Sequence, residues 1–258
     1  MEETGKNPIH VAERLFQVIE RLAENGPMGI MDLSAELGFH KSTTHRLVTS
    51  LQYMGYIRQD EESLKYALSL KFLEIGSKIL EQTNMASLIH PSLKKLSEQT
   101  GETVHLVRRE GTEAVYIDKV ESTVSSIRMV SRVGSRIPLY CSGVGKALLA
   151  ELPDPEIEDI WNSSEITSLT PYTVTRLSDL MDRIRGVREA GYAMDDEENE
   201  EGVRCIAVSI PDYHKEPVYA LSISAPVSRM TDARIAELST DVLTFKKDLE
   251  KTLGFSRS

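Results

Sequence analysis

Apolar residues recur at helical spacing in three consecutive segments near the start of the chain. The first covers residues 11–24, and the second covers residues 30–37 and ends at Gly38, a residue type common at helix C-termini. A third segment runs to about Met54, and Ser42 is the residue expected to cap its start. The pattern therefore predicts three short helices with a tight turn between the second and the third.

Two short segments then follow a period of two residues. Residues 56–59 and 65–68 alternate between apolar and polar positions on either side of the acidic stretch 60–63, which predicts a two-stranded hairpin. Three helices and a hairpin in this order form a winged helix-turn-helix, whose recognition helix enters the major groove of DNA. We therefore predict a winged helix-turn-helix domain over residues 8–69.

The rest of the chain predicts a linker helix over residues 70–83 and a mixed domain over residues 84–258. The helices expected in this domain cover residues 91–100, 143–150, 177–190 (capped by Thr175) and 231–253. The expected strands cover residues 103–108, 114–120, 125–130, 192–194, 205–210 and 218–224. Such a mixture predicts an α+β fold built on a largely antiparallel sheet.

Charge is distributed unevenly along the chain. A formal net charge of −10 over 258 residues excludes a general nucleic-acid coat, which needs positive charge over its whole surface. No acidic residue, however, lies between Glu36 and Asp60, whereas Lys41, Arg46 and Arg58 lie inside this window. A basic window in an acidic chain favours one compact DNA-binding surface.

The composition also bears on where the protein is expected to act. No apolar run approaches the roughly 18 residues needed to span a bilayer, and the N-terminus lacks the pattern of a secretion signal. The two cysteines, Cys141 and Cys205, cannot form a disulfide framework. These features lead us to expect a cytoplasmic protein without membrane attachment.

The start of the third helix carries the chemistry of DNA recognition. Hydroxyls and amides here can bind phosphates, and the Arg46 guanidinium can bind guanine or phosphate. Because the hairpin turn is acidic, Arg58 on the strand before it is the expected contact of the wing. The alternative is an ordinary solvated basic helix face. The residues predicted to bind DNA are Lys41, Ser42, Thr43, Thr44, His45, Arg46 and Arg58.

A glycine-rich segment, Gly143-Val144-Gly145-Lys146, superficially resembles a phosphate-binding loop. That motif requires an earlier glycine where Tyr140 stands and a Ser or Thr where Ala147 stands, so nucleotide binding is not expected. The segment nevertheless opens a predicted helix. Its free amides at Gly143 and Val144 can hold a small carboxylate.

The chemistry of Cys205 and of two nearby serines stays open on the residues alone. Cys205 follows the acidic segment 194–202, which is typical of a solvated loop, and a lone cysteine in an apolar strand is usually a core residue. No regular ligand spacing joins it to Asp195 or His214 for a metal, and no histidine is identified as a catalytic partner, since His90, His105 and His214 lie in unrelated contexts. Two hydroxyls that share one face of a strand, at Ser222 and Ser224, can line a polar pocket or meet solvent.

Taken together, several segments resemble the IclR family of bacterial transcription regulators over nearly the whole chain. The order and spacing of the segments carry the resemblance, and they are Ser42-Thr43-Thr44-His45-Arg46-Leu47, His90-Pro91, residues 100–104, residues 143–150, residues 191–198 and residues 202–207. It implies a winged helix-turn-helix, a linker helix and a C-terminal α/β effector domain related to GAF-type sensors. It also implies a homodimer or homotetramer, operator DNA as partner, a small organic acid as effector and no cofactor.

The resemblance further implies an effector pocket and a mode of action. The positions that match the family's pocket are Met129, Ile137, Gly143, Val144, Asp195, Cys205, Ser222 and Ser224. We expect a regulator, in the first instance a repressor, whose operator affinity changes when a keto acid or sugar acid binds there. The alternatives are an enzyme or metal-binding sensor that uses Cys205, and a DNA-binding protein whose C-terminal domain only oligomerises.

Overall fold

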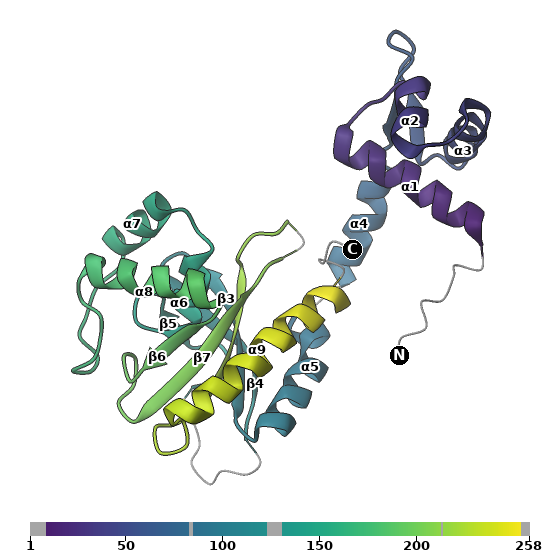
Figure 1. Cartoon of the computed structure of the whole chain (residues 1–258). Coiled ribbons are helices and arrows are strands. Elements are labelled where there is room, and N and C mark those ends of the chain that lie inside the picture. The colour runs from purple at the N-terminus through teal and green to yellow at the C-terminus, as the bar shows by residue number, and fades with distance from the viewer. Residues whose placement is uncertain (1–8, 83–84, 123–130, 213, 254–258) are drawn as a thin grey trace. The chain divides into compact units, whose positions relative to one another are not determined.

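The computed structural model describes residues 9–82, 85–122, 131–212 and 214–253. Contacts divide the chain into two compact units, Met1–Thr83 and Asn84–Ser258, which are described separately (Figure 1). The predicted strand over residues 125–130 lies outside the described residues.

The first unit contains the three predicted helices, the hairpin and one further helix. They are α1 (His10–Asn25), α2 (Ile30–Leu37), α3 (Lys41–Tyr53), β1 (Ile57–Gln59), β2 (Tyr66–Leu68) and α4 (Lys71–Gln82). The strands pair antiparallel, with Arg58 opposite Ala67. One apolar cluster joins the elements, and its fully buried members include Val18, Leu33 and Val48. The winged helix-turn-helix is therefore confirmed as the fold of this unit.

The turn between α2 and α3 depends on a glycine. Gly38 adopts a left-handed conformation with φ of 66°, where a side chain is strained, and the amide of Phe39 bonds back to the Ser34 carbonyl at 3.1 Å. The predicted cap of α3 is wrong by two residues. His40, rather than Ser42, occupies the cap position, and it makes no capping bond through its side chain. Ser42 is instead the second residue of the helix.

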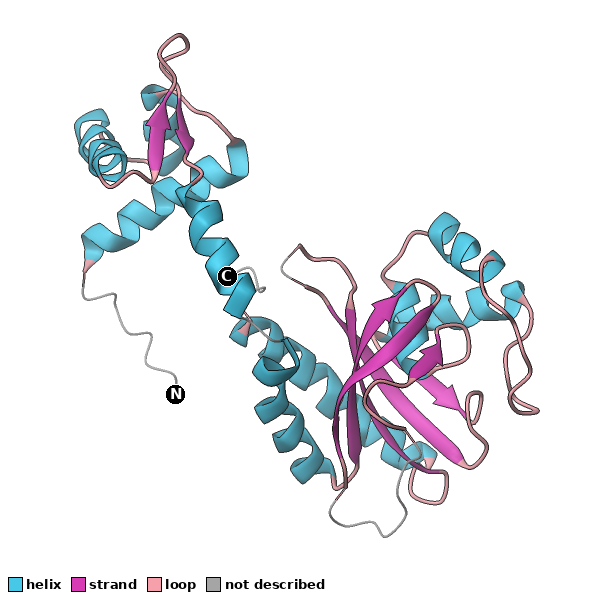
Figure 2. Cartoon of the chain, turned by 180° about the vertical axis from the view of Figure 1, so that it is seen from behind, coloured by secondary structure: helices cyan, strands magenta, loops and turns pink. Residues whose placement is uncertain are grey.

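The second unit is an antiparallel sheet with helices on both faces (Figure 2). Its six described strands follow the order β5-β4-β3-β8-β7-β6. Their bounds are β3 (Thr103–Glu110), β4 (Glu113–Val120), β5 (Arg136–Pro138), β6 (Ala193–Asp196), β7 (Val203–Ile210) and β8 (Tyr219–Pro226). The helices are α5 (Met85–Thr100), α6 (Gly143–Ala150), α7 (Asp154–Asn162), α8 (Leu177–Ala190) and α9 (Asp232–Thr252).

Alternation along the central strands builds a separate core on each face of the sheet. Ile206, Val208 and Leu221 pack with α5 and α9, whereas Ala207 and Ala220 pack with α6 and α8. The α/β architecture with an antiparallel sheet agrees with the prediction. The pattern did not predict α7 or the three-residue strand β5, and Thr175 is not a helix cap, because Arg176 occupies that position.

The short helix α6 lies unusually close to neighbouring backbone. A Cβ atom at Gly145 would lie 2.1 Å from the carbonyl oxygen of Leu139, which no side chain can tolerate. At Gly143 a Cβ would lie 3.4 Å from the Asp195 amide nitrogen and 3.5 Å from the Ala207 Cβ. Gly145 is therefore required by the close approach of α6 to the backbone of Leu139, whereas Gly143 places the start of α6 in ordinary van der Waals contact with β6 and β7.

Candidate functional site

The exposed face of α3 carries most of the residues predicted to bind DNA. Lys41, Ser42, His45 and Arg46 are exposed, and Thr43 is half-buried. Thr44 differs, because it is fully buried and its hydroxyl donates to the His40 carbonyl. Its side chain helps to hold the first turn of α3 and is not available to a phosphate, so we remove it from the set of DNA contacts.

The hairpin turn is held together by one of its acidic residues. The Asp60 carboxylate accepts hydrogen bonds from the Ser63 amide at 2.8 Å and from the Ser63 hydroxyl at 2.7 Å. These bonds, the backbone one first, lower the pKa of Asp60. Arg58 is exposed on β1, two residues before this turn. Its positive charge also lowers the pKa of Asp60, as a smaller effect than the hydrogen bonds from Ser63.

A cavity lies in the second unit between the N-terminus of α6 and the face of the sheet that α6 covers. It encloses about 430 Å³ of empty space, including a part open to solvent. Its described lining contains Ile137, Gly143, Val144, Asp195, Cys205, Ser222 and Ser224, together with His105, Tyr116, Ser131, Ser142, Asn199, Glu200 and Val203. Seven of the eight predicted pocket residues therefore line one cavity. The eighth, Met129, lies outside the described residues.

The N-terminus of α6 forms one wall of the cavity. The Ser142 hydroxyl caps the helix by accepting from the Gly145 amide at 3.1 Å, and it donates to the Pro138 carbonyl at 2.6 Å. The first two helical amides, of Gly143 and Val144, have no hydrogen-bond partner among the residues described. Such amides at the positive end of a helix can bind an anion.

The opposite wall is a row of hydroxyls and one imidazole on the sheet. Cross-strand pairing places His105 on β3 opposite Ser222 on β8, so both side chains point to the same face. The His105 Nδ1 atom lies 3.4 Å from the Ser222 hydroxyl and 3.3 Å from the Ser224 hydroxyl, and Nε2 lies 2.7 Å from the Ser131 hydroxyl. Burial, with a smaller effect of Lys119, lowers the pKa of His105 to about 3, so the ring is neutral.

Sequence reasoning did not identify His105 as a site residue. His105 and Ser222 lie 117 residues apart, and the strand pairing that joins them is a tertiary contact. The available signal was a polar residue between the apolar residues Val104 and Leu106 of a predicted strand. The expectation that His105 lies in a context unrelated to Cys205 is wrong, because both residues line the same cavity.

Asp195 occupies the edge of the cavity on β6 and is almost fully buried. Its Oδ1 atom accepts hydrogen bonds from the amides of Glu198 at 2.8 Å and Asn199 at 3.3 Å. Burial raises the pKa of Asp195 to about 7, although the Lys146 ammonium and the Glu198 amide act in the opposite direction. The carboxyl group is therefore poised between its protonated and ionised forms near neutral pH.

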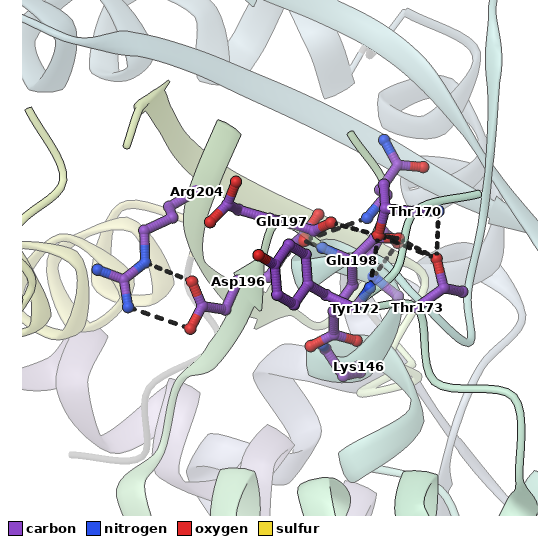
Figure 3. A network of polar contacts seen from close by, with 12 residues as sticks. Lys146, Thr170, Tyr172, Thr173, Asp196, Glu197, Glu198 and Arg204 are labelled. Atoms are coloured by element: carbon purple, nitrogen blue, oxygen red, sulfur yellow. Dashed lines mark hydrogen bonds and ion pairs between the residues drawn. The ribbon is translucent and has the colours of Figure 1, made fainter. Parts of the chain in front are cut away.

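The acidic segment around Asp195 is not simply a solvated loop. Asp195 faces inward, whereas the next residue, Asp196, forms a two-point ion pair with Arg204 at 2.6 and 3.1 Å. Glu198 is buried and pairs with Lys146 of α6 (Figure 3). Asp195 and Glu198, which the sequence pattern assigned to solvent, are therefore buried inside the fold.

Cys205 lies on β7 opposite Ser224 and shares its face of the sheet. Burial raises the pKa of the Cys205 thiol, and the nearby Asp195 carboxylate acts in the same direction. A protonated thiol that shares its cavity with a neutral imidazole lacks the activation of a cysteine nucleophile. Within the described residues no cluster of three or more His, Cys, Asp or Glu side chains could hold a metal ion.

Comparison with known proteins gives two family matches, one within the first unit and one that begins near its end and covers most of the second. The IclR helix-turn-helix domain matches residues 11–61, and the bacterial transcriptional regulator IclR C-terminal domain matches residues 77–250.

Across the described residues, no helix has the length and apolar character required to cross a membrane.

Individual relatives match along almost their full length. The acetate operon repressor of Salmonella typhimurium is 36% identical over 247 residues, which cover 95% of this chain and 90% of that protein. The transcriptional regulator KdgR of Escherichia coli is 35% identical over 255 residues, or 98% of this chain and 97% of that protein. The crystal structure of the Thermotoga maritima IclR is 31% identical with a TM-score of 0.63, and the match covers 95% of this chain and 99% of that one.

Proposed function

The chain belongs to the IclR family of bacterial transcription regulators, and on this premise we propose that it is a repressor controlled by a small organic acid. The acid binds in the cavity between α6 and the sheet, and its binding changes the affinity of the protein for operator DNA. The relatives named above are themselves a repressor and a transcriptional regulator.

The observation that carries the proposal is the polarity of the cavity walls. Two helix amides without a partner among the described residues, at Gly143 and Val144, share the lining with hydroxyls and a neutral imidazole. The acidic residues of the described lining are Asp195 and Glu200, and it contains no Lys or Arg. This arrangement suits one small anionic group held by hydrogen bonds rather than by ion pairs. A phosphate-rich ligand would require more positive charge.

A keto acid or sugar acid fits these walls. Its carboxylate accepts from the amides of Gly143 and Val144, while Ser222 and Ser224 bind its carbonyl or hydroxyl oxygens. Ile137 supplies an apolar contact, and Met129 is predicted to supply another. Asp195 accepts from a ligand hydroxyl when ionised and donates to the carboxylate when protonated.

The DNA contacts proposed for the first unit are Lys41, Ser42, Thr43, His45, Arg46 and Arg58. Arg46 reads a base edge or grips a phosphate, and the remaining residues bind phosphates. We propose that residues 8–69 bind DNA as part of a homodimer or homotetramer, since one recognition helix covers only a half-site. Residues 70–83 act as linker, and residues 84–258 bind the effector and oligomerise.

The two activities are coupled by thermodynamic linkage. An effector that binds one arrangement of the C-terminal units more tightly shifts the population toward it, and the linker helix passes that preference to the spacing of the recognition helices. Operator affinity then falls because the half-site spacing on DNA is set by its helical repeat.

The protonated state of the Cys205 thiol favours a role in binding and regulation over one in catalysis. Its thiol is protonated at neutral pH and is placed to contact the ligand as a weakly polar wall. We therefore propose no enzymatic activity and no cofactor.

The test is a gel-shift titration of the full-length protein on its own upstream region, with and without organic acids such as pyruvate and gluconate. We expect one acid class to change operator affinity by about 5- to 150-fold, the usual range of allosteric coupling. Unchanged operator affinity in the presence of an acid that calorimetry shows to be bound would disprove the control mechanism.

A further inference from the structure

A fully buried ion pair joins α6 to the turn that follows β6, close in sequence to residues that line the effector cavity. The Lys146 side chain is 1% exposed and the Glu198 side chain 4% exposed, and the ammonium contacts the Glu198 Oε1 atom (Figure 3). Glu198 Oε2 has no hydrogen-bond partner in the described structure. The desolvation of a buried ion pair offsets its attraction, so a pair with an unsatisfied oxygen contributes little net stability.

Both partners are covalently close to the cavity walls, although neither is part of the lining. Lys146 lies on α6, three residues after Gly143, whose amide is proposed to bind the effector. The Glu198 amide donates at 2.8 Å to the Asp195 carboxylate, at the edge of the cavity on β6. The pair therefore links the α6 wall of the cavity to the edge that carries Asp195.

The backbone at Glu197 and Glu198 is anchored on its other side as well. The Thr170 hydroxyl donates to the Glu197 carbonyl at 2.7 Å, and the Thr173 hydroxyl donates to the Glu198 carbonyl at 2.6 Å (Figure 3). Glu197 itself has a positive φ of 62°, which a side chain seldom adopts without such support. The turn from Asp195 to Asn199 is thus held in one conformation by neighbours on both sides.

We propose that Lys146 and Glu198 are positioning residues of the effector pocket, which fix the Asp195 carboxyl group against the N-terminus of α6 without touching the effector. This inference rests on the proposed function for the identity of the ligand. The charges that face Asp195 are Lys146 from α6 and Glu198 from the turn, and the Lys146 effect is the larger. Loss of both charges therefore also raises the pKa of Asp195.

The test compares full-length Lys146→Met with the double variant Lys146→Met/Glu198→Met. The single variant leaves the Glu198 charge buried without a partner and is expected to melt at lower temperature than the wild type. The double variant leaves no unpaired buried charge, so its melting temperature is expected to be close to that of the wild type. Lys246→Met is the control for loss of an ion pair elsewhere in the unit, because Lys246 pairs with Glu151 at 3.3 Å, the pair is partly exposed and neither residue lines the effector cavity.

The first readout needs no ligand. Hydrogen–deuterium exchange is measured on peptides that cover residues 195–200, whose amides at Glu198 and Asn199 bond to Asp195. We expect exchange at least about tenfold faster in the double variant and unchanged exchange in Lys246→Met. Wild-type exchange rates in the double variant would overturn the proposal, whether or not any acid binds.

The second readout is affinity for pyruvate and gluconate by calorimetry from pH 6.0, where Asp195 is largely protonated in every variant, to pH 8.5. At pH 6.0 we expect the double variant to lose at least about tenfold in affinity despite its restored melting temperature. Across the range we expect the pH at which affinity declines to move upward. Full recovery of wild-type affinity together with stability would show a purely structural pair. Absence of binding by the wild type would instead count against the proposed function, and the exchange measurement would still decide the positioning role.

Discussion

His105 on β3 and Ser222 on β8 are direct cross-strand partners, and the imidazole Nδ1 atom lies 3.4 Å from the serine hydroxyl. The ring is buried at the floor of the proposed effector cavity, and burial lowers its pKa to about 3. In the same cavity, burial raises the pKa of Asp195 to about 7. These opposite displacements lead to opposite effects of pH on stability.

For His105, the unfolded chain binds a proton near pH 6.5 and the folded chain only near pH 3. The stability that the neutral ring contributes is complete above pH 6.5 and is lost as the pH falls toward 3. We therefore expect His105→Gln to lose less stability than the wild type between pH 6.5 and pH 4.5, with a difference in Tm of roughly 5 °C or more. Thermal unfolding followed by circular dichroism across this range measures the effect. Parallel curves for the two proteins would show that His105 is not buried in its neutral form.

For Asp195, the unfolded carboxyl titrates near pH 4 and the folded one near pH 7. The folded chain binds more protons between these values, so stability falls as the pH rises from 4 to 7. In Asp195→Asn this loss is absent, and we expect its Tm to exceed that of the wild type at pH 8 and to approach it at pH 5. The comparison uses the same unfolding measurement, and a wild-type slope in the variant would contradict it.

Asp195 also predicts how effector affinity depends on pH. A carboxylate ligand meets a neutral Asp195 below about pH 7 and a second negative charge above it. We expect affinity for a bound monocarboxylate to fall by about tenfold per pH unit between pH 7.5 and pH 8.5, since one proton is taken up on binding. Calorimetry in two buffers of different ionisation enthalpy counts that proton directly. Asp195→Asn should bind without proton uptake, and a wild type that binds without uptake would refute the prediction.

On α3, the contrast between Arg46 and Thr44 separates DNA contact from helix stability. Arg46 is exposed, whereas Thr44 is buried and bonds to the His40 carbonyl. We expect Arg46→Ala to weaken operator binding by at least about 10- to 100-fold, the scale of a lost bidentate base contact, without change in Tm or in effector affinity. Thr44→Val, as the matched control, should lower Tm slightly and leave operator affinity within about threefold per folded molecule. The measurement is a gel shift, and equal affinities of wild type and Arg46→Ala would remove Arg46 from the interface.

The thiol of Cys205 provides a test between a sensor and an enzyme. Cys205→Ser preserves size and places a hydroxyl opposite Ser224, so we expect operator binding to be retained and effector affinity to change by no more than about tenfold. Thiol alkylation at pH 8 should be slow in the wild type, because burial raises the pKa of Cys205. Rapid modification by iodoacetamide, at the rate of a free thiolate, would support the enzymatic alternative.

Much of the fold could be predicted from local pattern. The helices of the first unit, the hairpin and the central strands of the sheet have a clear period of apolar positions, and Gly38 marks a turn that requires positive φ. The caps predicted for α3 and α8 were wrong, because a Ser or Thr near the start of a helix is only one way to satisfy the first amides. The three residues of β5 are too few to show a period, so only their pairing with β4 defines them.

The sequence by itself determined which residues are polar within apolar strands, and its resemblance to a family placed Asp195, Cys205 and the two serines in one pocket. Only the tertiary structure decided that His105 joins them, that Thr44 faces inward and that Lys146 meets Glu198, 52 residues away. The physical reason is that a short-range pattern reports on the face of one helix or strand. Whether a charge is buried, and which residue pairs with it, depends on strand order and on how closely α6 approaches the sheet. Both arise from contacts between distant segments.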